Sequence, residues 1–428
     1  MHRRFSGRTE IFMYNQSKIY THVKVSSKAE KTLRGGHIWV YRDEIKEING
    51  DFNNGDIVEV YSASDRFLGS GFINTKSKIA VRIISKNRND RFDTDFWERR
   101  VRYALSYRYS VMGKEDFNCC RLIFGEADTF PGLTVDRFDD ILSVQVACLG
   151  TELIKDMLYS LIVKVLREDY SQKVSAIYER NDLKVRTLEG MSEYCGFYTS
   201  GDLGQSLRSD LDGIAYITEN GIKYEVDYIN GQKTGFFLDQ KYNRAAIRKI
   251  SCGKSVLDCF THTGSFGLNA AAAGALHVNS VDISADALKT AEHNAKMNGL
   301  DGIITYTQAD VFELLSGLAD KKCRDYDFII LDPPAFTKSR DTLKNAIKGY
   351  RDINTLAMRI LPRGGYLATC SCSHFMTDTY FKQMLHNSAV DANVSLRQIE
   401  ARTQSPDHPI LWNVSETDYL KFYIFQVV

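Results

Sequence analysis

Beyond about residue 230, the sequence alternates between short apolar runs and segments whose apolar residues follow helical spacing. The apolar runs are SVLDCF, HVNSVDIS, IITYTQAD, YDFIILDPP and YLATCSCS, and the helix-like segments include SFGLNAAAAGA, ADALKTAEHNAKMNGL and INTLAMRILPRGG. Strands that alternate with helices usually pair in parallel and are buried on both faces. The pattern therefore predicts an α/β fold in which a parallel sheet is covered by helices on both sides.

The first of these runs ends in an acid and a turn. In VLDCFTHTGSFGLNAA, Asp258 ends the expected strand, and a turn of small residues leads into a helix. The backbone N–H groups of Thr263, Gly264 and Ser265 are expected to face a ligand at this edge of the sheet. Only one turn glycine precedes Phe266, and G-x-G-x-x-G is absent, so a phosphate-free nucleoside cofactor fits better than a dinucleotide.

Acids also end the strands that follow. Asp282 ends HVNSVDIS, where a carboxylate can accept both hydroxyls of a ribose, and Asp310 ends YTQAD, where one can accept from an adenine amino group. Each acid alone is more simply explained as a helix N-cap or turn former. Together with the first acid they resemble the Rossmann-like class of S-adenosylmethionine-dependent methyltransferases. Asp332 of FIILDPPAF then occupies the strand end of the substrate-handling motif, and Phe260, Ile283 and Asp332 join the candidate cofactor contacts.

Two thiols, Cys370 and Cys372, lie two residues apart in GGYLATCSCSHF. On a strand they would point to the same side. No second Cys/His pair stands at ligand spacing, so a metal site is not predicted, and burial as small side chains is the usual fate of cysteine. A thiolate added at C6 of a pyrimidine, however, makes C5 nucleophilic enough to accept a methyl group. We therefore predict one catalytic thiol, with Asp332 hydrogen bonding at N3 and the exocyclic amine of cytosine.

The chain is too long, at 428 residues, for one ordinary core, and its N-terminal part differs in character. Up to about residue 86, alternating apolar residues with turns near Asn49-Gly50 and Asn54-Gly55 predict a small β-barrel. DTDFWERRVRYALSYRYSVM then predicts a helix, followed by a hairpin, a helix and a strand. The basic residues Lys28, Lys31 and Arg34 lie near the aromatic residues Trp39 and Tyr41 in the sequence. This combination is typical either of a nucleic-acid-binding surface or of a solvent-exposed edge beside a core tryptophan.

Composition limits the setting of the protein. No apolar run approaches the roughly 18 to 20 residues of a membrane span, so neither membrane insertion nor secretion is expected. The nine scattered cysteines favour reduced thiols in a cytoplasmic protein. The formal net charge of +1 means that a nucleic-acid partner cannot be argued from overall charge.

Taken together, these segments resemble the family of rRNA large-subunit methyltransferase I, the 23S rRNA cytosine-C5 methyltransferases with an N-terminal PUA domain. The resemblance covers nearly the whole chain, and its carriers are GHIWVYRDEI, GDIVEVYSASDRFLGSGFIN, IYERNDLKVRTLEGM, GQKTGFFLDQKYNR, DCFTHTGSFGLNAAAAGA, LDPPAFTKSR, GYRDINTLAMRILPRGGYL, SCSHFMTD and DHPI. It implies a PUA RNA-binding domain over 18–88, an α+β linker domain over 92–200 and a Rossmann-like methyltransferase domain over 201–428.

The resemblance also implies partners and residue roles. The cofactor would be S-adenosylmethionine, and the substrate would be 23S rRNA, either naked or in an assembly intermediate. In GQKTGFFLDQKYNR the implied cofactor contacts are Lys233, Phe237, Asp239, Gln240 and Arg244. The family's Ser-Cys step matches Ser371-Cys372, which makes Cys372 the nucleophile. The related RNA cytosine methyltransferases with a Thr-Cys-Ser motif would instead select Cys370.

Other interpretations stay open from sequence alone. Asp-Pro-Pro motifs also serve methylation of guanine or of an exocyclic amine in RNA, which needs no thiol. A non-catalytic RNA-binding factor is a third alternative, although it would need neither Asp332 nor Cys372. A homodimer is among the assemblies that the sequence allows. MHRRFSGRTEIFMYNQ precedes the usual PUA start with no assigned role, and His408 of SPDHPI is expected in a surface loop.

Overall fold

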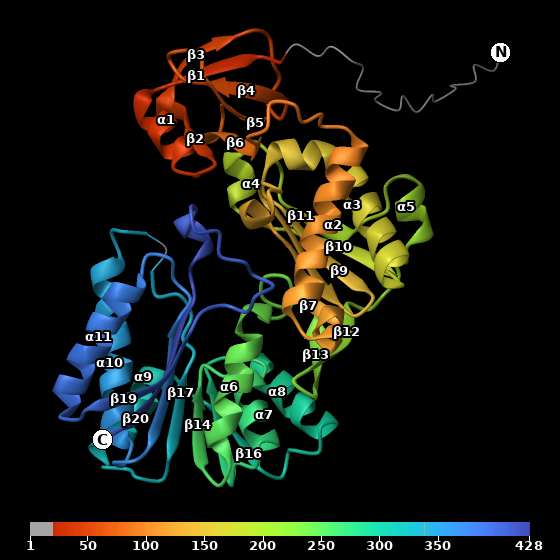
Figure 1. Ribbon diagram of the computed structural model, residues 1–428. Helices are drawn as coiled ribbons and strands as arrows, with labels where there is room; N and C mark the ends of the chain where they lie inside the picture. The colour runs from red at the N-terminus through yellow and green to blue at the C-terminus, as the bar shows by residue number, and fades with distance from the viewer. Residues whose placement is uncertain (1–19, 338) are drawn as a thin grey trace.

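The computed structural model describes residues 20–337 and 339–428, which form three parts in chain order (Figure 1). The N-terminal extension, on which the sequence offered no role, lies outside the described residues. None of the helices within the described residues combines the length and apolar character needed to cross a membrane.

The first part is a six-stranded sheet with its own apolar core. Its strand order is β2 (Trp39–Tyr41), β6 (Ile79–Ser85), β5 (Phe67–Ile73), β4 (Ile57–Tyr61), β1 (His22–Val25) and β3 (Ile45–Asn49), with α1 (Ser27–Arg34) alongside. The expected turns follow β3 and precede β4, where Gly50 and Gly55 have φ of 114° and 97°. Side chains other than glycine rarely adopt this backbone conformation, which explains the two glycines.

The middle part is a second sheet with two long helices. Its strand order is β11 (Tyr194–Phe197), β10 (Ala176–Asn181), β9 (Ile141–Val146), β8 (Leu133–Phe138) and β7 (Cys119–Phe124). The sheet is accompanied by α2 (Thr94–Val111), α3 (Leu149–Tyr170), α4 (Val185–Leu188) and α5 (Gly201–Ser206). Asp93 caps α2 by accepting from the Phe96 backbone N–H. The predicted order of helix, hairpin, helix and strand is confirmed.

The C-terminal part is a seven-stranded sheet. Its order is β16 (Ile304–Gln308), β15 (His277–Asp282), β14 (Ser255–Cys259), β17 (Phe328–Leu331), β18 (Tyr366–Ser371), β20 (Lys421–Val427) and β19 (Leu396–Arg402). The pairs from β16 to β18 are parallel, as predicted. The antiparallel β20, which lies between β18 and β19, was not among the predicted strands.

Helices cover both faces of this sheet, as predicted. In β17, Phe328 and Ile330 join one apolar cluster, and Ile329 and Leu331 join the other. Such alternation buries both faces of a strand and explains its continuous apolar sequence. The covering helices are α6 (Lys241–Ser251), α7 (Ser265–Ala272), α8 (Ala285–Met297), α9 (Val311–Asp320), α10 (Leu343–Ile360) and α11 (Asp378–Ala392). The hairpin of β12 (Ile214–Glu219) and β13 (Ile222–Asp227) packs into the apolar cluster that contains Phe328 and Ile330. This cluster also includes side chains of the middle part.

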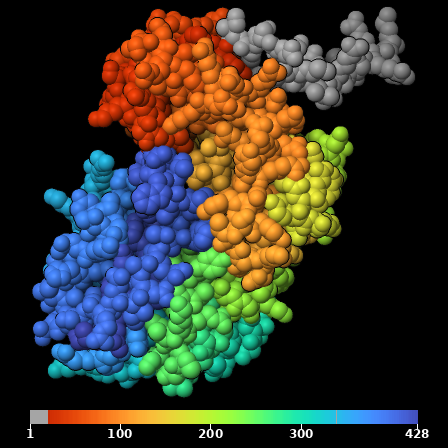
Figure 2. Space-filling model, in the orientation of Figure 1, coloured from red at the N-terminus to blue at the C-terminus, as the bar shows by residue number. Residues whose placement is uncertain are grey.

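The segment between β19 and β20, residues 403–420, is here called the strap, because it leaves the C-terminal sheet and reaches the other two parts. Val414 is fully buried in the core of the first part. In the middle part, a carboxylate oxygen of Asp407 accepts from the Arg121 backbone N–H at 2.9 Å. Figure 2 shows the C-terminal segment in contact with the N-terminal part. His408 is buried beside Asp407, so its placement in a surface loop was wrong.

Candidate active site

A cavity of ≈ 400 Å³ lies at the carboxyl ends of β14, β15 and β17. It brings together most of the side chains that the sequence singled out, although they come from segments more than a hundred residues apart. The candidates that line it are Lys233, Phe237, Asp239, Gln240, Arg244, Phe260, Thr263, Ser265, Phe266, Asp282, Ile283, Asp310, Asp332 and Cys372. Asp258, Gly264 and Cys370 do not line it.

Asp258 has a different place from the one expected. The strand continues for one residue beyond it, so its carboxylate lies beneath α7 and is fully buried. There it accepts from the Thr261 hydroxyl and from the Gly267 backbone N–H at 2.8 Å. A Cβ at Gly267 would stand 3.0 Å from this carboxylate, so glycine allows the close approach. Asp258 therefore shapes the turn under the cavity and does not line the cavity itself.

Gly264 also differs from the expectation. Its N–H donates to the Thr261 carbonyl at 2.9 Å, so it is used within the turn and does not face the cavity. Its φ is 83°, and a Cβ there would stand 2.9 Å from the Ala291 Cβ. The glycine thus lets the turn pass close to α8. Phe260 and His262 have φ of 62° and 50° in the same turn, which is unusual for residues with side chains and typical of functional sites.

The burial of Asp258 predicts a pH-dependent stability. Burial raises its pKa from 3.8 to about 7, against the opposing hydrogen bonds from Thr261 and Gly267. Between these pH values the folded state binds the proton and the unfolded state does not, so stability falls as pH rises. Relative to Asp258→Asn, which cannot titrate, the wild-type free energy of unfolding should fall by about 4 kcal/mol between pH 4 and 8. Urea unfolding at several pH values measures this, and a constant difference between the two proteins would contradict it.

Asp282 and Asp310 both lie at the cavity and also hold their own loops. One Asp282 oxygen accepts from the His262 backbone N–H and the other from the Ser284 N–H, both at 2.9 Å. Asp310 caps α9 by accepting from the Phe312 N–H at 2.8 Å and the Glu313 N–H at 3.2 Å. The capping role that the sequence left open for single acids is therefore real, and it coexists with a position on the cavity wall.

The segment before α6 forms the opposite wall. Arg244 is buried and pairs with the buried Glu219 through two hydrogen bonds of 2.6 and 2.8 Å. It also donates to the Phe237 carbonyl at 2.9 Å. Lys233, in the left-handed conformation with φ of 54°, places its ammonium 4.8 Å from the Phe237 ring centroid. The buried ion pair thus holds the backbone that presents Phe237 and Lys233 to the cavity.

Asp239 is a buried carboxylate on the same wall. One oxygen accepts from the Tyr419 hydroxyl at 2.7 Å, and the other is buried without a hydrogen-bond partner in the described residues. Burial alone would raise its pKa, but the charges of Lys233, His408 and Arg121 and the hydrogen bond from Tyr419 together lower it. A negative oxygen with no protein donor marks a place for a ligand cation or donor.

Asp332 stands at the end of β17, with Gln240 and Cys370 beside it. Its Oδ1 accepts from Gln240 Nε2 at 3.0 Å and from the Cys370 thiol at 2.8 Å. Burial raises the Asp332 pKa to about 6, although the hydrogen bond from Cys370 opposes this. Burial and the Asp332 charge raise the Cys370 pKa well above the usual range of a thiol. Cys370 is therefore a buried neutral donor that orients Asp332.

Cys372 differs from Cys370, because β18 ends at Ser371. Cys372 lies past the strand end, is half-buried and lines the cavity together with Asp332. The only hydrogen-bond contact of its thiol in the described residues is a long one, 3.9 Å to the Pro333 carbonyl. Burial and the Asp332 charge raise the Cys372 pKa to about 11, and the Lys233 charge lowers it. Of the two thiols, Cys372 is the one that a bound molecule can reach.

Sequence reasoning missed several residues that build the site. Glu219, Tyr419 and His262 contact the candidates. Glu219 and Tyr419 lie outside the segments that carried the prediction, whereas His262 lies within DCFTHTGSFGLNAAAAGA and was not singled out. Glu219 ends a strand of a hairpin, and Tyr419 lies in the strap, so no local pattern connects them to the cavity. Among the described residues, no group of three or more His, Cys, Asp or Glu side chains is arranged to hold a metal ion.

Comparison with known proteins gives matches over both ends of the chain. Residues 23–86 match a PUA-like domain, and residues 205–426 match an S-adenosylmethionine-dependent methyltransferase domain. Ribosomal RNA large subunit methyltransferase I of Shewanella denitrificans is 38% identical over 408 residues, covering 95% of this chain and 99% of the relative. The protein of the same name from Aliivibrio fischeri is 38% identical, covering 93% and 97%.

Solved structures agree in fold. A candidate methyltransferase in complex with SAH superposes with a TM-score of 0.77 at 22% identity, covering 95% of this chain and all of that one. A candidate SAM-dependent methyltransferase from Streptococcus mutans gives 0.76 at 23% identity with the same coverage. The predicted architecture, with a PUA-like domain first and a methyltransferase domain last, is confirmed. The chain therefore belongs to the ribosomal RNA large subunit methyltransferase I family, and it carries an S-adenosylmethionine-dependent methyltransferase domain.

Proposed function

We propose that this protein methylates C5 of a cytosine in 23S rRNA through a covalent bond between Cys372 and C6 of the base. The observation that carries the proposal is that Cys372 and Asp332 line one cavity, while Cys370 is buried behind Asp332. An amino methyltransferase needs no thiol at such a position. The relatives' name supports a large-subunit rRNA substrate, and the PUA-like domain supports contact with folded RNA.

The cavity has the groups that S-adenosylmethionine would need. Asp282 at the end of β15 would accept from the ribose hydroxyls, and the apolar side chains of Phe260, Ile283 and Phe312 would enclose the adenine. The unpartnered oxygen of Asp239 would accept from the ammonium of the methionine moiety. When bound, S-adenosylmethionine supplies an electrophilic methyl sulfonium and leaves as S-adenosylhomocysteine.

Cys372 would supply the nucleophile. After its proton has left to solvent, the thiolate adds to C6 of cytosine, and the electron pair of the C5–C6 double bond becomes available at C5 for the methyl group. Loss of the C5 proton to solvent then drives elimination of the thiolate, which restores the double bond and the enzyme. The positive charge of Lys233 favours the thiolate, because it lowers the Cys372 pKa.

Asp332 would bind the edge of the base. With a pKa of about 6, part of its population is protonated near neutral pH. The protonated carboxyl can donate to N3 while its other oxygen accepts from the exocyclic amine, and both bonds would draw electrons from the ring and favour addition at C6. Cys370 and Gln240 act as positioning residues, because their hydrogen bonds fix the orientation of Asp332. The reduced thiols that this mechanism needs fit a cytoplasmic enzyme.

A 23S rRNA transcript containing 5-fluorocytidine tests the proposal. Fluorine at C5 cannot leave as a cation, so elimination is blocked and the protein should stay bound to the RNA. With S-adenosylmethionine present, we expect an adduct that survives denaturing electrophoresis in the wild type and in Cys370→Ala. Cys372→Ala should form none.

Each other outcome has a definite meaning. An adduct that vanishes in Cys370→Ala and persists in Cys372→Ala would transfer the nucleophile to Cys370. Label transfer from tritiated S-adenosylmethionine to ordinary rRNA, with no adduct in the fluorinated transcript, would contradict C5 chemistry and favour an amino group as the acceptor. Absence of label transfer to any rRNA would contradict the enzymatic proposal as a whole.

A further inference from the structure

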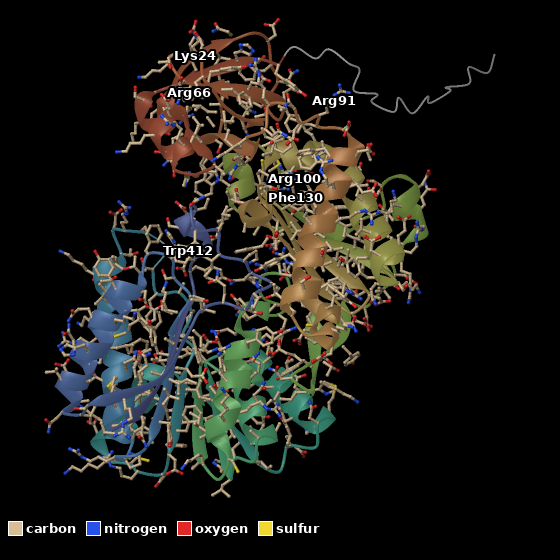
Figure 3. All side chains as sticks on the ribbon, in the orientation of Figure 1. Lys24, Arg66, Arg91, Arg100, Phe130 and Trp412 are labelled. Atoms are coloured by element: carbon tan, nitrogen blue, oxygen red, sulfur yellow. The ribbon has the colours of Figure 1, made fainter. Side chains whose placement is uncertain are left out.

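A second cavity, of ≈ 530 Å³, lies along α2 in the middle part and is separate from the candidate active site. Its lining combines side chains of α2 with Thr129 of the middle part and Pro409 of the strap. The strap thus contributes to the wall of the cavity through Pro409. Figure 3 labels Arg100 on this helix. Neither the family match nor the proposed chemistry uses this cavity.

One stripe of α2 provides the chemistry of the cavity. Arg99, Tyr103 and Tyr107 are spaced four residues apart, so they follow one another on the same face of the helix. Tyr103 is 65% exposed and Tyr107 39% exposed, which is high for aromatic side chains. Between them lies Ala104, a small side chain that leaves room beside the rings. The stripe offers two exposed aromatic rings within one hollow, and the Arg108 guanidinium lies 5.3 Å from the centroid of the Tyr107 ring.

Two arginines add a positive charge that the protein does not neutralise at contact distance. Arg99 and Arg100 lie 5.7 and 4.7 Å from the centroid of the Phe96 ring, and Arg100 also donates to the Thr129 hydroxyl. Within residues 20–337 and 339–428, neither guanidinium forms an ion pair; Asp90 attracts Arg100 only from a longer range. Arg100 is partly buried and Arg99 is exposed, and a guanidinium without a carboxylate partner is available to bind an anion.

The two acids at the cavity are already used. Asp128 accepts from Arg108 Nη2 at 2.7 Å and from the Phe124 backbone N–H at 2.6 Å. Asp90 accepts from the Ser85 hydroxyl at 2.5 Å and from the Asn87 amide at 3.0 Å. The groups that remain for a ligand are therefore two cations and two aromatic rings. Phosphodiester oxygens and unstacked bases are complementary to this set.

We infer that this cavity, here called the α2 subsite, binds a nucleotide of single-stranded RNA away from the methylated base. Arg99 and Arg100 contact its phosphate, and Tyr103 and Tyr107 stack on its base. The inference rests on the proposed function for the identity of the RNA. Since the two cavities share no lining residue, loss of the subsite should weaken RNA binding and leave the chemical step intact.

The test uses the full-length protein and an in vitro 23S rRNA transcript. Arg99→Gln with Arg100→Gln, and separately Tyr103→Ala with Tyr107→Ala, should each raise the Kd for the transcript about tenfold or more. The arginine pair should also flatten the salt dependence of binding, because fewer counterions are released. At saturating RNA, kcat should stay within about twofold of wild type, and affinity for S-adenosylmethionine should not change.

Matched controls come from exposed residues outside the subsite. Tyr109→Ala, on the same helix, and Arg167→Gln, on α3, should bind as the wild type does. If the Arg100 change disturbs folding, Arg99→Gln with Tyr103→Ala, both at exposed positions, carries the test. Unchanged affinity in the subsite variants, with wild-type methylation of the transcript, would overturn this inference alone. A wild-type protein that neither binds nor methylates the transcript would contradict the proposed function as well.

Discussion

Replacing Cys372 with alanine is expected to lower kcat for methyl transfer to rRNA by at least about a thousandfold. Without a thiolate at C6, C5 of cytosine has no electron pair available to attack a methyl sulfonium. A thousandfold loss corresponds to about 4 kcal/mol of transition-state stabilisation. Transfer of a tritiated methyl group to a 23S rRNA transcript, under single-turnover conditions, measures the chemical step directly.

Cys370→Ala provides the matched control, since both changes remove one thiol from the same short segment. Its loss removes a hydrogen bond to Asp332 and leaves Cys372 in place, so a decrease of about tenfold is expected. S-adenosylmethionine should bind both variants as it binds the wild type, which calorimetry can establish. Equal losses in the two variants would argue against distinct roles, and a larger loss in Cys370→Ala would reverse the assignment.

Arg244→Met is expected to have the largest effect on stability, lowering the free energy of unfolding of the methyltransferase domain by about 3–5 kcal/mol. The change leaves the Glu219 carboxylate buried without its partner, because the two side chains are 0% and 1% exposed. It also removes the donor to the Phe237 carbonyl, which lies on the cavity wall. Urea unfolding followed by circular dichroism measures the decrease in the free energy of unfolding. The folded fraction of Arg244→Met should also bind S-adenosylmethionine more weakly than the wild type does.

The double variant Glu219→Leu with Arg244→Met separates two causes. If the uncompensated charge causes the loss, the double variant should recover much of the stability, because a buried apolar pair can replace a buried ion pair. Lys289→Met is the control at an exposed pair, since the Lys289 and Asp286 side chains are 76% and 91% exposed, and no resolvable change is expected there. A double variant as unstable as Arg244→Met would show that shape, not charge, dominates at this site.

The parts of the fold that follow local patterns could be predicted from the sequence. The strands β14 to β18 and the helices α2 and α8 have the apolar periodicity that their burial requires, and their positions agree with the expectation. The antiparallel β20 could not be predicted in this way, since the direction in which a strand enters a sheet depends on its connection. That connection is the strap, which makes its contacts hundreds of residues away in sequence.

In the candidate site, too, the sequence alone could not predict which individual side chains face the cavity. Asp258 and Asp282 both follow apolar runs, but β14 extends past Asp258 whereas β15 ends at Asp282. One carboxylate therefore points under α7 and the other reaches the edge of the sheet. Cys370 and Cys372 divide in the same way, because β18 ends between them. The sequence motifs predicted which residues belong to the site. The residue at which each strand ends determines which of these side chains face the cavity.

The position of Val414 has a consequence for folding during synthesis. N-terminal domains generally fold first as the chain emerges from the ribosome. Here the core of the N-terminal part includes Val414, and Gly36 packs so close to the side chain of Asn413 that a Cβ would overlap it. The first part to be translated therefore completes its core only when nearly the whole chain has emerged. The order of synthesis is therefore the reverse of the order of final packing, so the PUA-like domain of a nascent chain stays incomplete until the methyltransferase domain has been made.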